Sequence, residues 1–256
     1  MKMSSWKFVV LMSVLALPLV GQADNIVLDN TTGDSSTLME SLPNDVTSSV
    51  DYVSVRRRNI SGSERNNIGA FKFELPSSVA AQVTEATLSF CLYKAAAATT
   101  TVYVYGLSES ASKGPVTEAN WSDSTITYNT MPGLYTADGN LQNQSVNTAE
   151  ATLLGSIDVE GGTASMSTIT LSTEALAQFL NSVSNGSVTF LLETRLVGSG
   201  RDEELQILSG QRSSSGSGSY PTLELTMVPE PAASGLILMA AVFVLLFKRM
   251  RRARCS

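Results

Sequence analysis

The chain of 256 residues contains no histidine. This absence excludes Ser-His-Asp and Cys-His catalytic arrangements and imidazole zinc sites, and it removes the commonest general base near neutral pH. Glycoside hydrolysis needs only a pair of carboxylates, so an enzyme of that kind stays possible. The composition otherwise favours a protein without a catalytic centre.

Cysteine is almost as scarce, because Cys91 and Cys255 are the only two. Two cysteines provide neither a disulfide framework nor a cysteine metal site. We expect Cys91 to be a small buried side chain within a strand.

Basic residues are few outside the two ends of the chain. Residues 24–230 hold all 23 acidic side chains but only 10 of the 17 basic ones, which gives this part a formal charge of −13. Such a charge argues against nucleic acid or anionic lipid as the main partner and favours solubility outside the cell.

The N-terminus has the three parts of a secretory signal. Lys2 and Lys7 precede an apolar run at 8–20, and Gly21-Gln22-Ala23 supplies small residues for signal peptidase. We expect cleavage after Ala23, so that 1–23 is a signal peptide. The alternative, an uncleaved anchor or core helix, is disfavoured because about thirteen apolar residues are too short for a bilayer core of about 30 Å.

The C-terminus combines three further features. Residues 228–231 read Val-Pro-Glu-Pro, 232–247 carry no charge, and 248–254 contain five cations. The 16 apolar residues predict a single short helix of about 24 Å, with the cations on the cytoplasmic side. Cys255 would then lie on the opposite side of the membrane from Cys91, so the two cannot pair.

This order of motif, apolar helix and basic end resembles the PEP-CTERM sorting signal of Gram-negative bacteria that make extracellular polysaccharide. The resemblance covers 228–256 and implies that an exosortase recognises Pro229, Glu230 and Pro231. It further implies that the tail is a processing handle with only transient membrane insertion. Signal peptidase and an exosortase are the expected processing partners, and the cell envelope or extracellular matrix is the expected location.

The body, 24–227, is long enough for one domain and has the pattern of an all-β protein. Short β-branched and aromatic runs alternate with period two and are separated by Gly, Ser, Asn, Asp or Pro. They predict strands at 52–55, 69–75, 86–93, 101–105, 168–171, 187–193, 205–208 and 222–226. One short helix is expected after Ser172 or Thr173, ending at Asn185-Gly186. We therefore predict an antiparallel β-sandwich of jelly-roll type with one helical insert.

Several phrases of the body are similar to the extracellular jelly-roll module DNRLRE, which is related to carbohydrate-binding modules. The matching phrases lie at 71–76, 83–88, 102–105, 121–132 and 213–225. The chain departs from that pattern in its first strand, at Glu74, where aspartate is usual, and throughout 143–163. The resemblance implies a jelly-roll fold and, for some members, carbohydrate binding.

Two groups of residues are candidates for carbohydrate binding. Trp121 and Tyr128 could stack on sugar rings while Asn129 or Asp123 binds hydroxyl groups; the alternative is that Trp121 packs over a sandwich edge and Tyr128 lies in a strand. Arg56 and Arg58 alternate along a predicted strand and should point to one face. Their guanidinium groups suit uronate or sulfate, although charge that protects an edge strand explains them equally well.

The acidic residues give weaker candidates. Asp202, Glu203 and Glu204 form the densest group, but their setting after Gly198-Ser199-Gly200 predicts a solvated loop. Asp24, Asp29 and Asp34 recur every five residues in a polar segment and could bind a structural Ca²⁺, although their spacing fits no EF-hand.

These observations lead to three hypotheses. The first is an exported, non-catalytic β-sandwich that associates with polysaccharide and does not bind nucleic acid. The second is a carboxylate-dependent polysaccharide-degrading enzyme, a glycosidase or lyase. The third is a purely structural or adhesive envelope protein.

Overall fold

The computed structural model describes residues 24–31, 33–47, 51–76, 83–141, 143–184, 186–195, 198–210 and 220–228. The chain divides into two units, of which Asn25–Met227 is the β-rich body. The other unit, Met1–Asp24 with Val228–Ser256, lies outside the described residues except for Asp24 and Val228. The predicted signal peptide, the motif Pro229-Glu230-Pro231 and the apolar helix 232–247 therefore all fall outside them. Within the described ranges, no helix is long and apolar enough to span a membrane.

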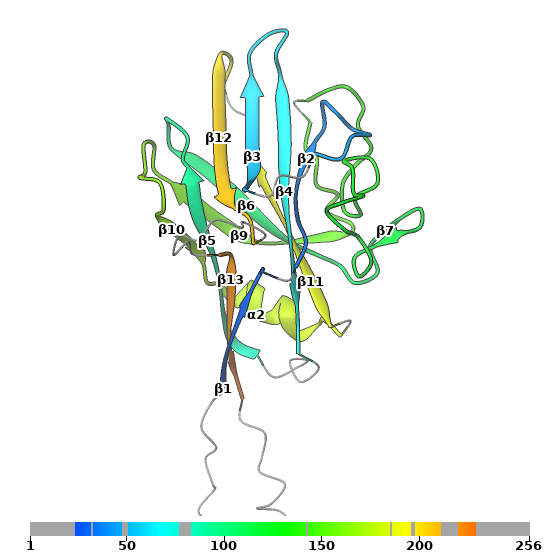
Figure 1. Ribbon diagram of the computed structural model, residues 1–256, viewed down its shortest axis with the longest axis vertical. Coiled ribbons are helices and arrows are strands. Elements are labelled where there is room, and N and C mark those ends of the chain that lie inside the picture. The colour runs from blue at the N-terminus through cyan, green and yellow to red at the C-terminus, as the bar shows by residue number, and fades with distance from the viewer. Residues whose placement is uncertain are drawn as a thin grey trace, which may run out of the picture. The chain divides into compact units, whose positions relative to one another are not determined.

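Antiparallel strands make up most of the body, together with one helix, α2 (Glu174–Asn181) (Figure 1). The strands are β1 (Asp24–Asp29), β2 (Ser35–Met39), β3 (Tyr52–Asn59), β4 (Arg65–Glu74), β5 (Val83–Lys94), β6 (Thr100–Leu107), β7 (Ser112–Lys113), β8 (Val116–Thr117), β9 (Ala151–Val159), β10 (Thr168–Leu171), β11 (Ser187–Thr194), β12 (Arg201–Leu208) and β13 (Thr222–Met227). The prediction of an all-β antiparallel body with one short helix is confirmed.

The strands follow the order β1-β13-β5-β12-β3-β4-β11-β6-β9, with β10 added on β5 and β2 on β4. The long strand β5 pairs with β13 and β10 over its first part and with β12 at Leu92 and Lys94. Strand β5 is not a neighbour of β4 in this order, yet the rings of Phe71 in β4 and Phe90 in β5 are in contact, with centroids 5.1 Å apart and planes tilted by 49°. The two parts of the sheet therefore face each other across a core, as in a β-sandwich.

The main core lies between these facing strands. In β5, Ala86, Leu88, Phe90 and Leu92 are buried as their period-two alternation predicts. Cys91 is also buried, as expected, and it forms no disulfide. Burial of apolar side chains from both layers supplies the main stabilisation of the fold.

Helix α2 closes one end of this core. Thr173 is its N-cap, as predicted, and the Thr173 hydroxyl accepts a hydrogen bond from the Leu176 amide at 3.1 Å. The helix buries Leu176, Ala177 and Leu180. Asn181, at its last turn, bonds to the backbone N–H and C=O of Val83, both at 2.8 Å, and so fixes the start of β5.

A second apolar cluster covers the opposite face of β4 and β11. The long segment between β6 and β9 contributes half of its members, and the others come from β2, β4, β6, β9 and β11. Its members are Leu38, Ile68, Ala70, Tyr105, Leu107, Ala111, Trp121, Ile126, Tyr128, Met131, Leu134, Val146, Ala151 and Leu191. All eight residues of β11 are buried because this strand has a packed layer on each face. In Figure 1 the segment appears as the green loops beside β2 and β4.

Several local predictions were wrong. Asp202, Glu203 and Glu204 lie in β12, paired with β3, and not in a solvated loop. Tyr128 lies in a turn and not in a strand. Strands β1, β2, β7, β8 and β9 were not predicted at all.

Candidate functional site

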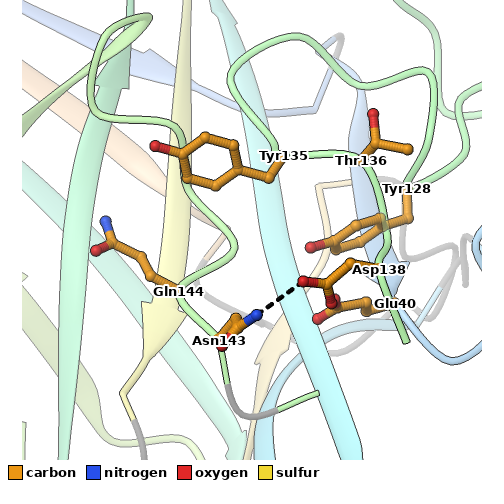
Figure 2. A pocket seen from close by; sticks show the side chains of 7 residues that line it. All are labelled: Glu40, Tyr128, Tyr135, Thr136, Asp138, Asn143 and Gln144. Carbon is orange, nitrogen blue, oxygen red and sulfur yellow. Dashed lines mark hydrogen bonds between the residues drawn. The ribbon is translucent and has the colours of Figure 1, made fainter. Parts of the chain in front are cut away.

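A pocket of about 350 Å³ lies at the outer side of the second apolar cluster. We call it the Tyr135 pocket; its lining residues are Glu40, Tyr128, Tyr135, Thr136, Asp138, Asn143 and Gln144. Figure 2 shows Tyr135 and Gln144 on one side of this space, with Tyr128, Asp138 and Glu40 on the other. Apart from Glu40, which directly follows β2, all of these residues come from the segment between β6 and β9.

Backbone and amide contacts position the two turns that build the pocket. The backbone N–H of Asn129 donates to the Pro43 carbonyl at 2.9 Å, and the side-chain oxygen of Asn129 accepts from the Ala137 N–H at 3.0 Å. The Tyr135 N–H donates to the Ser145 carbonyl at 2.9 Å. These bonds fix the stretch that carries Tyr135 and Thr136 against the residues that follow β2.

Asp138 is oriented by its own loop. Its Oδ1 accepts from the Asn140 N–H at 2.7 Å, and its Oδ2 accepts from Asn143 Nδ2 at 2.8 Å. The Asn143 bond, drawn in Figure 2, joins two of the lining side chains. Side-chain bonds of this kind to nearby backbone are typical of Asp and Asn in turns.

The buried side chain of Arg57 binds the loop that carries Asp138 and Asn143. Its guanidinium donates to the carbonyls of Leu141, Asn143 and Thr194 and lies 3.5 Å from Glu193 Oε1. Burial lowers the pKa of Arg57 despite the opposing effect of Glu193. The loop that carries Asp138 and Asn143 is therefore attached to the sheet through a buried charge.

Glu40 is the most buried carboxylate of the pocket, at 6% exposure. It accepts a hydrogen bond from Asn66 Nδ2 at 2.7 Å and a longer one from Ser145 Oγ. Burial raises the pKa of Glu40, and the charge of Asp138 raises it further, against the effects of Asn66 and Arg57. Glu40 thus holds a proton more readily than an exposed glutamate does.

The two tyrosines differ in what they offer a ligand. Tyr128 is buried, and burial raises the pKa of its phenol, so only the edge toward the pocket is available. Tyr135 is 49% exposed and can present a ring face to solvent. Exposed aromatic faces beside amides and carboxylates provide apolar contact together with hydrogen-bonding groups.

The residues predicted from sequence are only partly brought together. Tyr128 lines the pocket, and Asn129 stabilises its wall but does not line it. Trp121 is buried in the second cluster, where its indole N–H donates to Thr189 Oγ1 at 2.8 Å. The structure therefore gives Trp121 and Asn129 packing and hydrogen-bonding roles.

Arg56 and Arg58 share a face, as their alternation predicts, and both reach Asp202. Arg56 donates to the two oxygens of Asp202 at 2.8 and 2.6 Å, and Arg58 Nε lies 3.8 Å from Asp202 Oδ2. The bond from Arg56 lowers the pKa of Asp202. The charge of this arginine pair is therefore partly compensated within the sheet.

The three aspartates considered for Ca²⁺ do not converge. Asp24 and Asp29 are at opposite ends of β1, and Asp29 bonds to Thr31. Asp34 lies 3.2 Å from Lys72 Nζ. In the part of the chain that the structure describes, no group of three or more acidic, Cys or His side chains could hold a metal ion.

Sequence reasoning missed Glu40, Tyr135, Asp138, Asn143 and Gln144. The turn sequence Asp138-Gly139 marks a loop, but no pattern connects that loop with Glu40, almost a hundred positions earlier. The chain matches no known protein-family model, and no curated protein matches it.

Proposed function

We propose that this protein is an exported β-sandwich of jelly-roll type that binds polysaccharide at the cell envelope or in the extracellular matrix, without transforming it. The Tyr135 pocket is the observation that carries the binding part of this proposal. It combines a half-exposed aromatic ring with amides and carboxylates whose positions are fixed by hydrogen bonds.

A sugar ring suits this arrangement for two reasons. Its C–H face can pack on the ring of Tyr135, and its hydroxyls can donate to Asp138 and Glu40 or bond with Gln144. Asn143 and Asp138 are already bonded to each other, so binding costs little additional side-chain ordering at these positions.

The export part of the proposal is supported by the sequence of the two ends. A signal peptide ending at Ala23 and the motif Pro229-Glu230-Pro231 are consistent with export and exosortase processing. Mass spectrometry of the protein recovered from its cells tests this part. We expect loss of 1–23 and of the residues after the Pro-Glu-Pro region; an intact chain from Met1 to Ser256 in the cytosol would overturn it.

The binding part is tested with a glycan array probed with the protein recovered after expression of the full chain. We expect binding to a subset of neutral or amino-sugar polymers, weakened in Tyr135→Ala and unchanged in the control Tyr93→Ala. Tyr93 suits this role because it is similarly exposed but stacks on Tyr52, and it does not line the pocket. Absence of binding across the array leaves a structural or adhesive role.

One observation favours a second function, that of a carboxylate-dependent glycosidase. Glu40 has a raised pKa and lies beside Asp138 on one side of the pocket, and glycosidases use one protonated and one ionised carboxyl group. This hypothesis predicts release of new reducing ends from a bound polymer. Turnover that survives both Glu40→Gln and Asp138→Asn would exclude these residues as its cause, and absence of turnover on every bound polymer supports the non-catalytic function.

A further inference from the structure

Lys72 lies in an unusual position for a lysine, in the last part of β4, a strand that is covered on both faces. Its side chain is 5% exposed, and its Nζ lies 3.2 Å from Asp34 Oδ2. The Nζ also donates to the carbonyls of Trp121 and Ala119, and it sits 4.8 Å from the centroid of the Trp121 ring. The lysine is thus enclosed by the second apolar cluster.

The backbone holds the two residues side by side. The Lys72 N–H donates to the Asp34 carbonyl at 2.9 Å. Ser35, which follows Asp34, and Phe71, which precedes Lys72, are register partners in β2 and β4. The Lys72 carbonyl accepts a hydrogen bond from the Asn30 side chain. Because the pair is fixed on adjacent strands, its local concentration is far above that of free groups in solution.

The Asp34 carboxylate is held by a different contact at each of its two oxygens. Asp34 Oδ1 accepts from the Asp123 N–H at 3.1 Å, while Oδ2 faces Lys72 Nζ. A backbone N–H at one oxygen stabilises negative charge that develops there during nucleophilic addition. The other oxygen faces the amine and can receive its protons.

We propose that Lys72 and Asp34 condense to an intramolecular isopeptide bond that joins β4 to the segment leading into β2. The new bond forms between Lys72 Nζ and Asp34 Cγ, and the bond from Cγ to Oδ2 breaks. Of the three ammonium hydrogens, two leave with Oδ2 as water and one stays on the amide nitrogen. The reaction conserves charge and needs no oxidant, reductant or co-reactant.

Burial gives this condensation a driving force. An enclosed ion pair loses much of its hydration, and this cost can exceed the attraction between its charges. A second carboxyl group, that of Glu118, lies in the same layer and is only 1% exposed. It accepts a hydrogen bond from Thr189 Oγ1 at 2.9 Å, and Thr189 of β11 is the register partner of Lys72 in β4. An amide replaces the buried ammonium of Lys72 and the 25% exposed carboxylate of Asp34 by one neutral group.

A covalent link of this kind has a clear structural use. Residues 24–228 contain a single cysteine, Cys91, so no disulfide can link two parts of this body. The link would close a loop across 38 positions of sequence, between residues that remain adjacent in the fold. Closing such a loop reduces the conformational freedom of the unfolded chain, as a disulfide does.

The test is a tryptic digest, under denaturing conditions, of the protein isolated from cells that express the full chain. An acylated Lys72 resists trypsin, so peptide 66–94 should stay uncut and be joined to the peptide that carries Asp34 and ends at Arg56. The joined species should weigh about 18 Da less than its two parts, the mass of one water. Separate, full-mass peptides with cleavage after Lys72, from protein with an intact near-ultraviolet circular dichroism spectrum, would overturn the proposal and leave an ion pair only.

Two variants verify the atoms involved. Lys72→Arg keeps the positive charge but should abolish the joined species. Asp34→Asn should still react but release ammonia, so the loss becomes about 17 Da instead of 18 Da. A loss of 18 Da that persists in Lys72→Arg would show that other residues react.

Discussion

Arg57 and Glu193 form an ion pair inside the protein, with Arg57 Nη2 3.5 Å from Glu193 Oε1 and side chains only 1% and 0% exposed. Glu193 Oε1 also accepts from the Ser145 N–H at 3.0 Å, while Arg57 donates to three backbone carbonyls. The pair therefore connects β3 and β11 to the loop that forms the Tyr135 pocket. Removing one partner leaves a buried, uncompensated charge.

We predict that Arg57→Met lowers the free energy of unfolding by about 3–5 kcal/mol, because Glu193 and three carbonyls lose their partner. Urea unfolding followed by circular dichroism measures the change. Arg58→Met is the control, since Arg58 is on the same strand, is partly exposed and contacts Asp202; it should cost less than about 1 kcal/mol. Equal effects of the two substitutions would contradict the role given to Arg57.

Glu40 should make stability depend on pH in a defined direction. Its pKa is raised in the folded protein, so the native state holds the proton more tightly than the unfolded chain. The stability that Glu40 contributes is then fully present below its ordinary pKa of about 4.3 and is lost as pH rises through the raised value. Glu40→Gln removes this titration and keeps an acceptor for Asn66.

The measurement is the free energy of unfolding of wild type and Glu40→Gln as pH rises from about 4 to 7.5. We expect the glutamine variant to become more stable relative to wild type as pH rises. A difference that is constant with pH, or that changes in the opposite direction, would show that the environment of Glu40 is not as described.

Tyr135 should contribute to binding much more than to stability. We predict that Tyr135→Ala weakens binding of the recognised glycan by roughly 2- to 10-fold, the size of an aromatic contact of about 0.5–1.5 kcal/mol. Because the ring is half exposed, unfolding should change by no more than about 0.5 kcal/mol. Titration calorimetry and thermal unfolding on the same variant separate the two effects.

Asp202 should partly neutralise the positive charge that Arg56 and Arg58 offer to an acidic ligand. Asp202→Asn removes the carboxylate that both arginines contact, so binding of uronate- or sulfate-bearing polymers should increase. The cost in stability should be small, about 0.5–1 kcal/mol, because the pair is near the surface. Unchanged binding of acidic polymers would assign the two arginines to the sheet alone.

Gly133 should resist substitution for a steric reason. Its φ is +75°, and a Cβ added there would lie 2.4 Å from Leu107 Cδ1, in the second apolar cluster. Gly62 has a φ of +73° but no atom within 4 Å of its added Cβ. Both alanine variants carry the same backbone strain, so Gly133→Ala should lose about 1–3 kcal/mol more than Gly62→Ala through overpacking. Equal losses would show that Leu107 moves aside.

Alternation predicted most strands because one face of each packs on the main core. Strand β9 escaped prediction because its alternation changes phase: the pairing with β6 shifts register between Val104 and Tyr105, opposite Gly155 and Leu153. Gly155 adopts a φ of +152° at this irregularity. A period-two search across such a bulge finds two short fragments in place of one strand.

The charged residues show a second limit. Asp202, Glu203 and Glu204 follow a Gly-Ser-Gly segment, which predicts a loop, but their partners Arg56, Arg57 and Arg58 lie opposite them in β3. Lys72 lies in the predicted strand 69–75, and the local sequence does not indicate that a second layer of side chains covers it. Pairings between positions this far apart in sequence depend on tertiary structure, which local patterns do not contain.

The pocket is lined by Glu40 and by residues of the long segment between β6 and β9, and none of these lining residues is a member of the main core. Under the proposed function, substitutions at Tyr135, Thr136 or Gln144 should therefore change ligand preference while the facing sheets keep their packing. The loops that carry these three side chains are then the place to alter glycan preference without disturbing the main core.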